Sequence, residues 1–348
     1  MPGRAVQYRR YGTARDVLEV ARDLPVPEVG PDELLVRVCA SSVNPIDCAV
    51  RGGYGRAFFE ARGLSRWPMC PGRDVSGEVI AIGPYGPATS HSWQVGDLII
   101  AATLGGANAD YARVPQNWAA LKPASLSFIE AASIPYSALT AWSALVDAAG
   151  LNPAQAAGRR VIVTRAAGGV GGLAVQMLKA WGAYVAATCS TRNVEFVRAL
   201  GADRVIDYSK ESVKGLLHDF DLAFDASFDL EEALLDALKV QGDARYVSIV
   251  TPKLRLIDAL GLEEGLRAGD ELLAERVAAQ RLLGRSYHWA FMRPNGEALK
   301  VIAALVDAGR LRPIVDRTFV LEEIVAAHEH CESGRSRGRI VIDLGGGS

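Results

Sequence analysis

Short apolar runs alternate with amphipathic segments through the middle of the chain. The apolar runs are typical of strands buried on both faces, and they are Arg160 to Thr164, Tyr184 to Cys189, Arg204 to Tyr208, Asp221 to Asp225 and Arg245 to Val250. Segments with helical spacing lie between them, at Leu173 to Trp181, Asn193 to Leu200 and Leu230 to Val240. This alternation predicts a doubly wound parallel sheet, and so an α/β architecture.

The two ends of the chain have a different pattern. Strand-like stretches separated by turns rich in Gly and Pro fill the first third, and they include Glu33 to Val38, Val75 to Ile82 and Asp97 to Ala102. From about Leu311, strand-like pieces return around a helical segment, at Arg317 to Val320, Glu322 to Cys331 and Arg339 to Asp343. We therefore expect a mostly-β domain at residues 1–127 and 311–345, and a domain built on the parallel sheet at residues 128–310.

Composition fits two ordinary globular cores and excludes several classes of protein. The chain has 348 residues, of which 49% are hydrophobic and 22% charged. At about 150 residues per domain, this length predicts two domains. A formal charge of −2 gives no field that would attract nucleic acid or an anionic membrane. The most apolar run, Ala131 to Val146, is broken by Pro135 and is too short to span a bilayer.

The cysteines and the first residues bear on the compartment. The five cysteines are scattered and odd in number, which favours a reducing environment over a disulfide framework. The first residues, MPGRAVQYRRYG, contain no apolar signal segment. We expect a cytoplasmic protein, or a mitochondrial matrix protein if the source is eukaryotic, although no clear transit peptide is present.

A glycine-rich loop carries the best chemical signal. Ala167, Gly168, Gly169, Val170 and Gly171 follow a predicted strand and open a predicted helix, as a dinucleotide fingerprint requires. Alanine occupies the place of the first glycine of that fingerprint. The second glycine would let the backbone approach a diphosphate, and the helix N-terminus would present amides to it.

The end of the second central strand bears on the choice of cofactor. An NAD site usually has an acidic residue there for the ribose 2′-hydroxyl. This chain has Ser190 and Arg192, and the pair suits the 2′-phosphate of NADPH. Each charge-assisted hydrogen bond would favour NADPH by about tenfold to a hundredfold. In the alternative reading, Arg192 caps the next helix in solvent. Tyr208, at the end of the third strand, either supports the adenosine phosphate or packs.

Several sequence blocks, taken with the loop, resemble a known family. They are residues 42–47 (SVNPID), 72–77 (GRDVSG), 135–142 (PYSALTAW) and the loop 166–171 (AAGGVG). The chain resembles the zinc-free, quinone-oxidoreductase branch of the medium-chain dehydrogenase/reductase superfamily. Blocks 246–252, 287–291 and 306–313 are similar to those of the reticulon-interacting NADPH oxidoreductases and their bacterial relatives. The resemblance implies a GroES-like domain, a Rossmann domain, a homodimer, and reduction of a quinone or an activated C=C bond by NADPH.

The resemblance also implies roles for single residues. Tyr54 matches the family's proton donor, Asn44 would hydrogen-bond the acceptor or the nicotinamide ribose, and Thr140 would hold the carboxamide. In the alternative reading, Tyr54 closes a Gly-rich loop. Further cofactor contacts are expected at Val250, Ala290 and Phe291, and pocket walls at Tyr136, Trp289 and Trp67, unless these aromatic residues belong to the core.

No metal is expected. The positions that correspond to the catalytic zinc ligands of the superfamily hold Asn44, Arg73 and Asp74, which cannot form a soft site. On a helix, His328 and Cys331 share a face and His330 does not, so at most two ligands converge there. Cys48 has no histidine partner that the sequence identifies, and we expect an inert thiol.

Two further functions and one departure stay open. An enoyl-thioester reductase would need an entrance, for which Arg56, Arg62 and Arg66 are candidates. A non-catalytic NADPH-binding interaction protein would keep the loop without turnover. The segment Ser286 to Phe291 is a candidate edge strand for dimer pairing. The stretch Asp225 to Phe228 lacks the glycine that the family has after the fourth Rossmann strand, so contacts at that loop are in doubt.

Overall fold

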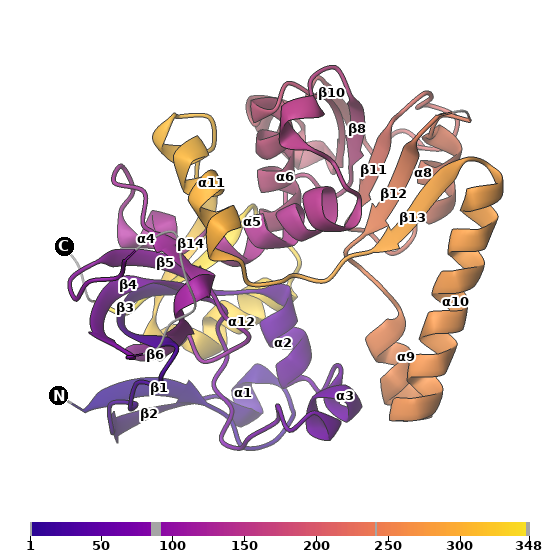
Figure 1. The fold of residues 1–348 in the computed structure, drawn as a ribbon. Coiled ribbons are helices and arrows are strands. Elements are labelled where there is room, and N and C mark those ends of the chain that lie inside the picture. The colour runs from indigo at the N-terminus through magenta and orange to yellow at the C-terminus, as the bar shows by residue number, and fades with distance from the viewer. Residues whose placement is uncertain (1, 85–91, 241, 346–348) are drawn as a thin grey trace. The chain divides into compact units, whose positions relative to one another are not determined.

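The computed structural model describes residues 2–84, 92–240 and 242–345 (Figure 1). The chain forms two compact units. The first comprises Met1–Leu139, Pro294–Gly309 and Pro313–Ser348, and the second comprises Thr140–Arg293 and Arg310–Arg312.

The second unit is built on a six-stranded sheet in the order β10-β9-β8-β11-β12-β13, and every pairing in it is parallel. Its strands are β8 (Arg160–Val163), β9 (Tyr184–Cys189), β10 (Arg204–Asp207), β11 (Leu222–Asp225), β12 (Ala244–Ser248) and β13 (Arg285–Trp289). Its helices are α6 (Gly169–Ala180), α7 (Val194–Ala199), α8 (Glu231–Ala237), α9 (Lys253–Leu260) and α10 (Leu262–Leu282). The strand order has its switch point between β8 and β11, which confirms the predicted doubly wound Rossmann sheet.

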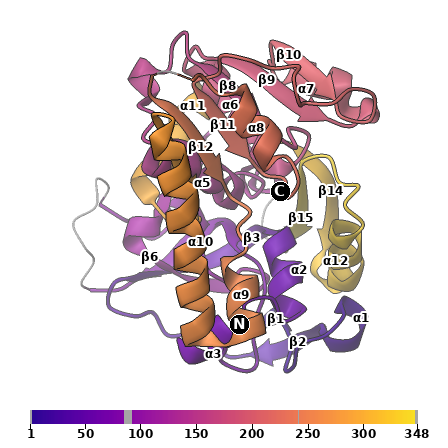
Figure 2. The same ribbon diagram turned by 90° about the vertical axis from the view of Figure 1, so that its right-hand side faces the viewer.

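One face of this sheet is covered by α8 and α10. Tyr246 and Tyr287 of the sheet and Phe220, just before β11, pack in one cluster. Leu234 of α8 and Leu273 of α10 belong to the same cluster. Figures 1 and 2 show α9 and α10 as a helical hairpin beside β13. A Cβ at Gly265 of α10 would lie 2.3 Å from the Cα atom of Ile257 of α9. The hairpin therefore depends on this glycine for its close helix contact.

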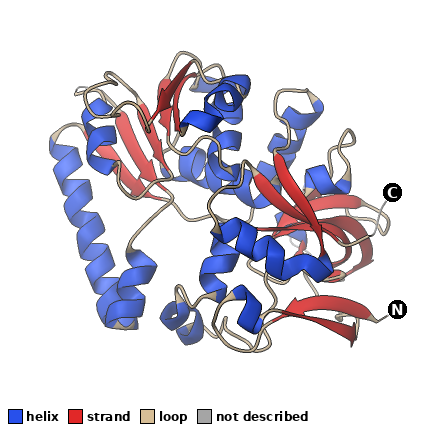
Figure 3. Ribbon diagram, turned by 180° about the vertical axis from the view of Figure 1, so that it is seen from behind, coloured by secondary structure: helices blue, strands red, loops and turns tan. Residues whose placement is uncertain are grey.

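The first unit holds a seven-stranded sheet and a two-stranded one, seen in red in Figure 3. The larger sheet has the order β14-β15-β3-β4-β5-β7, with β6 also pairing with β3, and every pairing but β14–β15 is antiparallel. Its strands are β3 (Glu33–Val43), β4 (Asp74–Ile82), β5 (Leu98–Ala102), β6 (Tyr111–Pro115), β7 (Ala119–Leu121), β14 (Val315–Val320) and β15 (Arg339–Asp343). The smaller sheet pairs β1 (Gly3–Gln7) with β2 (Glu19–Leu24). The strands of this unit come from both ends of the chain.

Short helices join the strands of the first unit. They are α1 (Ala14–Val17), α2 (Pro45–Arg51), α3 (Arg56–Ala61), α4 (Phe128–Ala131), α11 (Gly296–Asp307) and α12 (Ile324–Glu332). The helix α5 (Pro135–Trp142) begins in this unit and runs on into a π-helical turn, Ser143–Ala148, in the second. Single 3₁₀ turns are Gln116–Trp118, Pro153–Gln155, Thr191–Asn193 and Leu321–Glu323.

The bounds of the two units differ from the expected domain bounds at three places, one of which is that residues 311–312 belong to the second unit. Residues 128–139 and the helix α11 lie with the mostly-β unit. The position of α11 has a clear physical reason, because a Cβ at Gly296 would lie 2.4 Å from the carbonyl oxygen of Ala119 on β7. The helix is therefore packed directly on the backbone of that strand. Among the described residues, no helix is long and apolar enough to cross a membrane.

Candidate functional site

The glycine-rich loop connects β8 to α6, as the fingerprint predicts. Arg165 turns the chain with a φ of 50°. Gly168 is the N-cap residue of α6, so no side chain caps this helix end. In the described part of the chain, the amides of Gly169, Val170 and Gly171 have no hydrogen-bond partner. Such first-turn amides carry the positive end of the helix dipole. This end of the 12-residue helix α6 therefore fits a phosphate group.

Gly171 is needed for packing. A Cβ at this position would lie 2.6 Å from the carbonyl oxygen of Arg165. At Gly168 the same construction gives an ordinary 3.4 Å contact with that oxygen. The absence of a side chain at Gly171 thus lets α6 pack against the turn. Gly168 and Ala167 have little or no side chain, so the backbone of the loop is not covered by bulky groups.

Ser190 and Tyr208 follow two neighbouring parallel strands, as predicted for the adenosine end of the cofactor. Asp207 pairs with Cys189 in register, and the Tyr208 amide donates to the carbonyl oxygen of Cys189 (3.1 Å). The next residues, Ser190 and Tyr208, are therefore opposite each other at the same edge of the sheet. Arg192 is exposed one turn further on, and Tyr208 is also exposed. A hydrogen bond from the Thr191 hydroxyl holds the pKa of Asp207 below its ordinary value.

Asp225 occupies the switch point between β8 and β11. Its Oδ1 accepts hydrogen bonds from the Thr164 hydroxyl (2.8 Å) and from the amide and hydroxyl of Ser227 (2.8 and 2.6 Å). Its Oδ2 accepts one from the Tyr246 hydroxyl (2.7 Å). Ser227 belongs to the stretch that departs from the family pattern. Its structural role is to donate hydrogen bonds to the buried carboxylate of Asp225.

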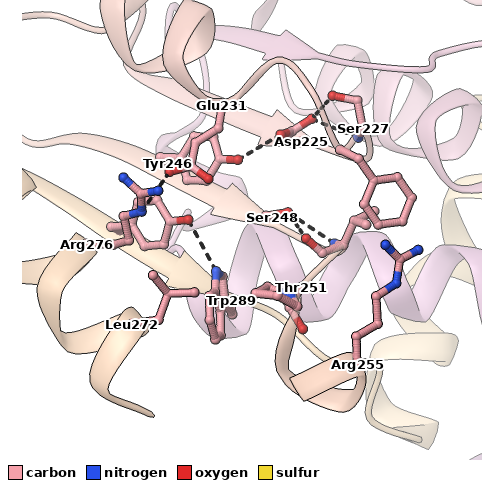
Figure 4. Close-up of a pocket in the computed structure, with 14 residues that line it drawn as sticks. Asp225, Ser227, Glu231, Tyr246, Ser248, Thr251, Arg255, Leu272, Arg276 and Trp289 are labelled. Atoms are coloured by element: carbon pink, nitrogen blue, oxygen red, sulfur yellow. Dashed lines mark hydrogen bonds and ion pairs between the residues drawn. The ribbon is translucent and has the colours of Figure 1, made fainter. Parts of the chain in front are cut away.

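The predicted nicotinamide contacts lie at the ends of β12 and β13. The Val250 amide donates to the Ser248 hydroxyl (3.1 Å), and the Ala290 amide donates to the Ser248 carbonyl (2.9 Å). Ala290 is buried and Phe291 is half exposed. Trp289 lines a pocket beside them, with Val250 in the same lining (Figure 4).

In the first unit, strand register brings three separate segments together. Ala40 of β3 pairs with Ser76 of β4, so Ser42 faces Asp74 two residues further on. On the other side of β3, Val43 pairs with Ile340 of β15, which places Arg339 beside Asn44. The sheet thus assembles a buried polar centre from Ser42, Asn44, Asp74 and Arg339, and each of these residues is less than 5% exposed.

The polar centre fixes the orientation of the Asn44 amide. Asp74 Oδ2 accepts hydrogen bonds from Asn44 Nδ2 (3.1 Å), Arg339 Nη2 (2.6 Å) and the Ser42 hydroxyl. Because an ionised carboxylate can only accept, the nitrogen of the Asn44 amide must face Asp74. The oxygen then points away, and it has no hydrogen-bond partner among the described residues. A buried acceptor without a partner is costly and suits a ligand that supplies a donor.

Asp47 and Arg73 brace the turn that carries Asn44. Asp47 Oδ2 accepts from the Asn44 amide (2.8 Å), and Oδ1 accepts from Arg73 Nη1 and from the Gly72 amide (3.3 Å). The Arg73 guanidinium also lies over the Tyr136 ring, 6.0 Å from its centroid. Asp47 therefore joins the turn at Asn44 to the segment Gly72–Arg73.

The remaining predicted residues are placed as follows. Tyr54 is half-buried in the turn between α2 and α3, and its amide donates to the carbonyl oxygen of Ala49 (2.9 Å). Tyr136 opens α5, where its amide donates to Asp74 Oδ1 (2.6 Å), and Thr140 is buried further along that helix. Trp67 is 41% exposed and packs edge-on against Tyr8 and Tyr11, with ring centroids 5.7 and 5.1 Å away.

The expectation that Cys48 lacks a histidine partner is wrong. Its Sγ lies 3.3 Å from Nδ1 of His328, a residue 280 positions away on α12. A hydrogen bond with Cys331 and burial raise the pKa of the Cys48 thiol, and burial lowers the pKa of His328 to about 4. Both shifts favour the neutral forms, so this pair does not generate a thiolate. His330 is turned away from them and contacts Asp316 (2.7 Å).

Sequence reasoning missed two groups that the structure places at these sites. Arg339 and Ser42 complete the polar centre, and Arg255 of α9 lines the pocket beside Trp289. Arg339 lies 265 residues from Asp74, and no local pattern connects them. Arg56, Arg62 and Arg66 are exposed on α3 and the loop after it, where Arg62 lies over the Phe58 ring.

Comparisons with known proteins agree with this geometry. Residues 30–124 match the alcohol dehydrogenase GroES-like domain, and residues 200–342 match the family described as zinc-binding dehydrogenase. A mitochondrial NAD(P)H oxidoreductase, RTN4IP1 of Danio rerio, is 37% identical over 96% of this chain and 89% of its own length. The 2-methylene-furan-3-one reductase of Solanum lycopersicum is 31% identical over 97% of this chain and 78% of its own length.

The fold has a close counterpart among solved structures. The quinone oxidoreductase from Coxiella burnetii superposes with a TM-score of 0.80 at 28% identity, covering 99% of this chain and all of that one. Its similarity and that of the RTN4IP1 protein extend over both units rather than over the nucleotide-binding part alone. The chain therefore belongs to the medium-chain dehydrogenase/reductase family of oxidoreductases that includes the NAD(P)H oxidoreductase RTN4IP1.

Proposed function

We propose that this protein reduces quinones or activated C=C bonds of α,β-unsaturated carbonyls with NADPH, and that it does so without zinc. The observation that carries the proposal is the fixed amide of Asn44, whose buried oxygen accepts no hydrogen bond from the described residues. An amide oxygen needs a donor, and the nicotinamide ribose has hydroxyl groups whereas a quinone has none. We therefore assign Asn44 to the cofactor ribose rather than to the acceptor.

The donor set at this centre supports chemistry without zinc. Both Asp74 oxygens already accept hydrogen bonds, from Arg339, Ser42, Asn44 and the Tyr136 amide. Arg73 is ion-paired with Asp47 and has no lone pair to offer a metal. A polarised carbonyl or quinone needs less Lewis-acid assistance than an alcohol does, so reduction is the assigned direction.

The cofactor supplies a hydride, and the protein supplies its position. We propose that the amides of Gly169, Val170 and Gly171 bind the diphosphate, and that Ser190, Arg192 and Tyr208 bind the 2′-phosphate. Val250, Ala290 and Phe291 would hold the nicotinamide end, together with Thr140. The names of the tomato reductase and the Coxiella oxidoreductase support the two acceptor classes.

We propose Tyr54 as the proton donor. Hydride addition to an enone or a quinone leaves negative charge on oxygen, and a positioned hydroxyl can neutralise it. Replacing Tyr54 by Phe should lower kcat by about 10²–10⁴, the usual range for a general acid. The measurement is NADPH oxidation at saturating acceptor, with NADPH affinity determined separately as a control. An unchanged kcat would assign the proton to water.

A panel of acceptors tests the function as a whole. Quinones, enones and enoyl thioesters are offered with NADPH, and we expect turnover with the first two classes. Turnover confined to enoyl thioesters would favour the enoyl-thioester reductase. Tight NADPH binding without any turnover would favour the interaction protein.

We also propose a homodimer formed through β13. This strand pairs with β12 on one side, and no described strand covers its other side. An open strand edge offers a row of unpaired backbone groups to a second copy. Light scattering at micromolar concentration should give twice the 37.1 kDa chain mass. A clean monomer there would contradict the proposal.

A further inference from the structure

A pocket with aromatic walls lies at the carboxyl ends of β11, β12 and β13, entirely within the second unit (Figure 4). Its cavity volume is about 220 Å³, and its aromatic walls come from Phe228, Tyr246, Tyr287 and Trp289. Pockets for drug-sized ligands start at about 300 Å³, so this one suits a single small ring system. Tyr246 and Tyr287 are stacked on each other, with ring centroids 4.8 Å apart, and both are almost fully buried, so they form the floor of the pocket.

The polar groups of these walls are used up among themselves. The Tyr246 hydroxyl donates to Asp225 (2.7 Å), and the Trp289 Nε1 donates to the Tyr287 hydroxyl (3.2 Å). The guanidinium of Arg276 is paired with Glu231, its Nε lying 3.3 Å from Oε1. Among the aromatic walls, Phe228 and Trp289 can therefore offer ring surface to a ligand, which favours a flat ring.

Arg255 is the exception in the lining. Its guanidinium carbon lies 4.7 Å from the centroid of the exposed Phe228 ring. It forms no ion pair or hydrogen bond with any residue that the structure describes. Figure 4 shows Arg255 across the opening from Arg276. A guanidinium with unused donors at the mouth of the pocket can bind a carboxylate in two-point fashion.

We propose that this pocket binds the hydride acceptor as a flat aromatic ring that carries an anionic group, with Arg255 as the residue that recognises the charge. This deepens the proposed function and rests on it. Val250, which we assign to the nicotinamide end of the cofactor, also lines the pocket, so a bound ring lies beside that end. Phe228 stands where the family pattern has a glycine, and its ring stacks with Arg255 and forms part of the wall.

The cofactor diphosphate is the competing anion for Arg255. The diphosphate-binding loop follows β8, whereas Arg255 follows β12, and β11 separates these two strands in the sheet. Arg255 therefore lies two strands away from the glycine-rich loop along the sheet. The same argument predicts that removal of its charge leaves NADPH affinity unchanged.

Redox-inert probes test the site without turnover. The affinities of 2-naphthoate and of uncharged 2-naphthylmethanol are measured by calorimetry, with the protein saturated in NADP⁺. We expect naphthoate to bind more tightly, and Arg255→Gln to weaken it about tenfold while naphthylmethanol is unaffected, as for the loss of one charge-assisted hydrogen bond. The matched control is Arg267→Gln, which removes the same charge from an exposed residue of α10 that is paired with Glu264 and Glu271.

Three results would overturn the proposal. These are equal affinity for the two probes, equal loss in the two arginine variants, and a loss of NADPH affinity in Arg255→Gln, which would return this residue to the cofactor site. The outcome is separable from that of the proposed function. Naphthoate binding through Arg255 without NADPH-dependent turnover would refute the reductase and leave the anion site standing.

Discussion

The proposed cofactor site of the second unit (the crevice) and the polar centre of the first are built in opposite ways. The crevice is made of consecutive residues at strand ends, such as Ala167 to Gly171, and its contacts are largely with backbone. The polar centre gathers Ser42, Asp74 and Arg339 from three strands, and its contacts join buried side chains. The crevice can be recognised from a local sequence motif, whereas the polar centre exists only after the sheet has formed.

This difference sets what a substitution costs. Side chains at the edge of the crevice stand in water, where screening weakens each contact. The Asp74–Arg339 pair is buried, and its charges depend on one another because neither can return to water. We therefore expect substitutions in the polar centre to affect stability and those in the crevice to affect affinity.

Asp74→Ala should give the largest effect. It leaves the Arg339 guanidinium buried without its carboxylate, and breaking such a pair from one side costs about 3–5 kcal/mol. The measurement is the free energy of unfolding in urea. Glu232→Ala is the control, because it breaks an exposed pair with Lys214 and should change little. Equal losses in both variants would remove the distinction between the two regions.

The crevice was largely predictable because its signals are local. The run Tyr184 to Cys189 forms β9 with the predicted bounds, and the other predicted strands of this sheet differ from the structure by a residue or two. The spacing of apolar residues and the turn residues between them are enough to predict strands that are buried on both faces. The hairpin of α9 and α10 was not predicted, because Gly265 and Gly269 lower the helix propensity of a largely polar segment.

The polar centre could be named from a resemblance but not assembled from sequence. The resemblance picks out Asn44 and Asp74, yet nothing near either residue indicates Arg339 as their partner. The contact between Cys48 and His328 could not be predicted for the same reason, because it forms only when α2 packs against α12. Contacts between residues so far apart in the chain depend on how strands and helices are arranged in the fold. No short stretch of the sequence indicates that arrangement.

His328 provides the next test, through pH. Burial lowers its pKa to about 4 from an ordinary 6.5, so the unfolded chain takes up the proton first. The stability that it contributes is present above pH 6.5 and is lost as the pH falls from 6.5 towards 4. Between pH 7 and pH 5, unfolding should become easier by about 2 kcal/mol more than in His328→Gln. Parallel pH profiles of the two proteins in urea would show that this histidine is not the group responsible.

Arg192→Gln should give the smallest effect, and it tests the crevice. Because Arg192 is exposed, loss of its proposed contact with a 2′-phosphate should lower NADPH affinity about tenfold and leave NADH affinity unchanged. Arg198→Gln is the matched control, since it removes the same charge from the neighbouring helix α7, where Arg198 is paired with Glu195. Fluorescence titration measures the affinity of each variant for NADPH and for NADH, relative to the unaltered protein. If both variants weaken NADPH alike, the preference comes from overall charge and not from a residue placed at the end of β9.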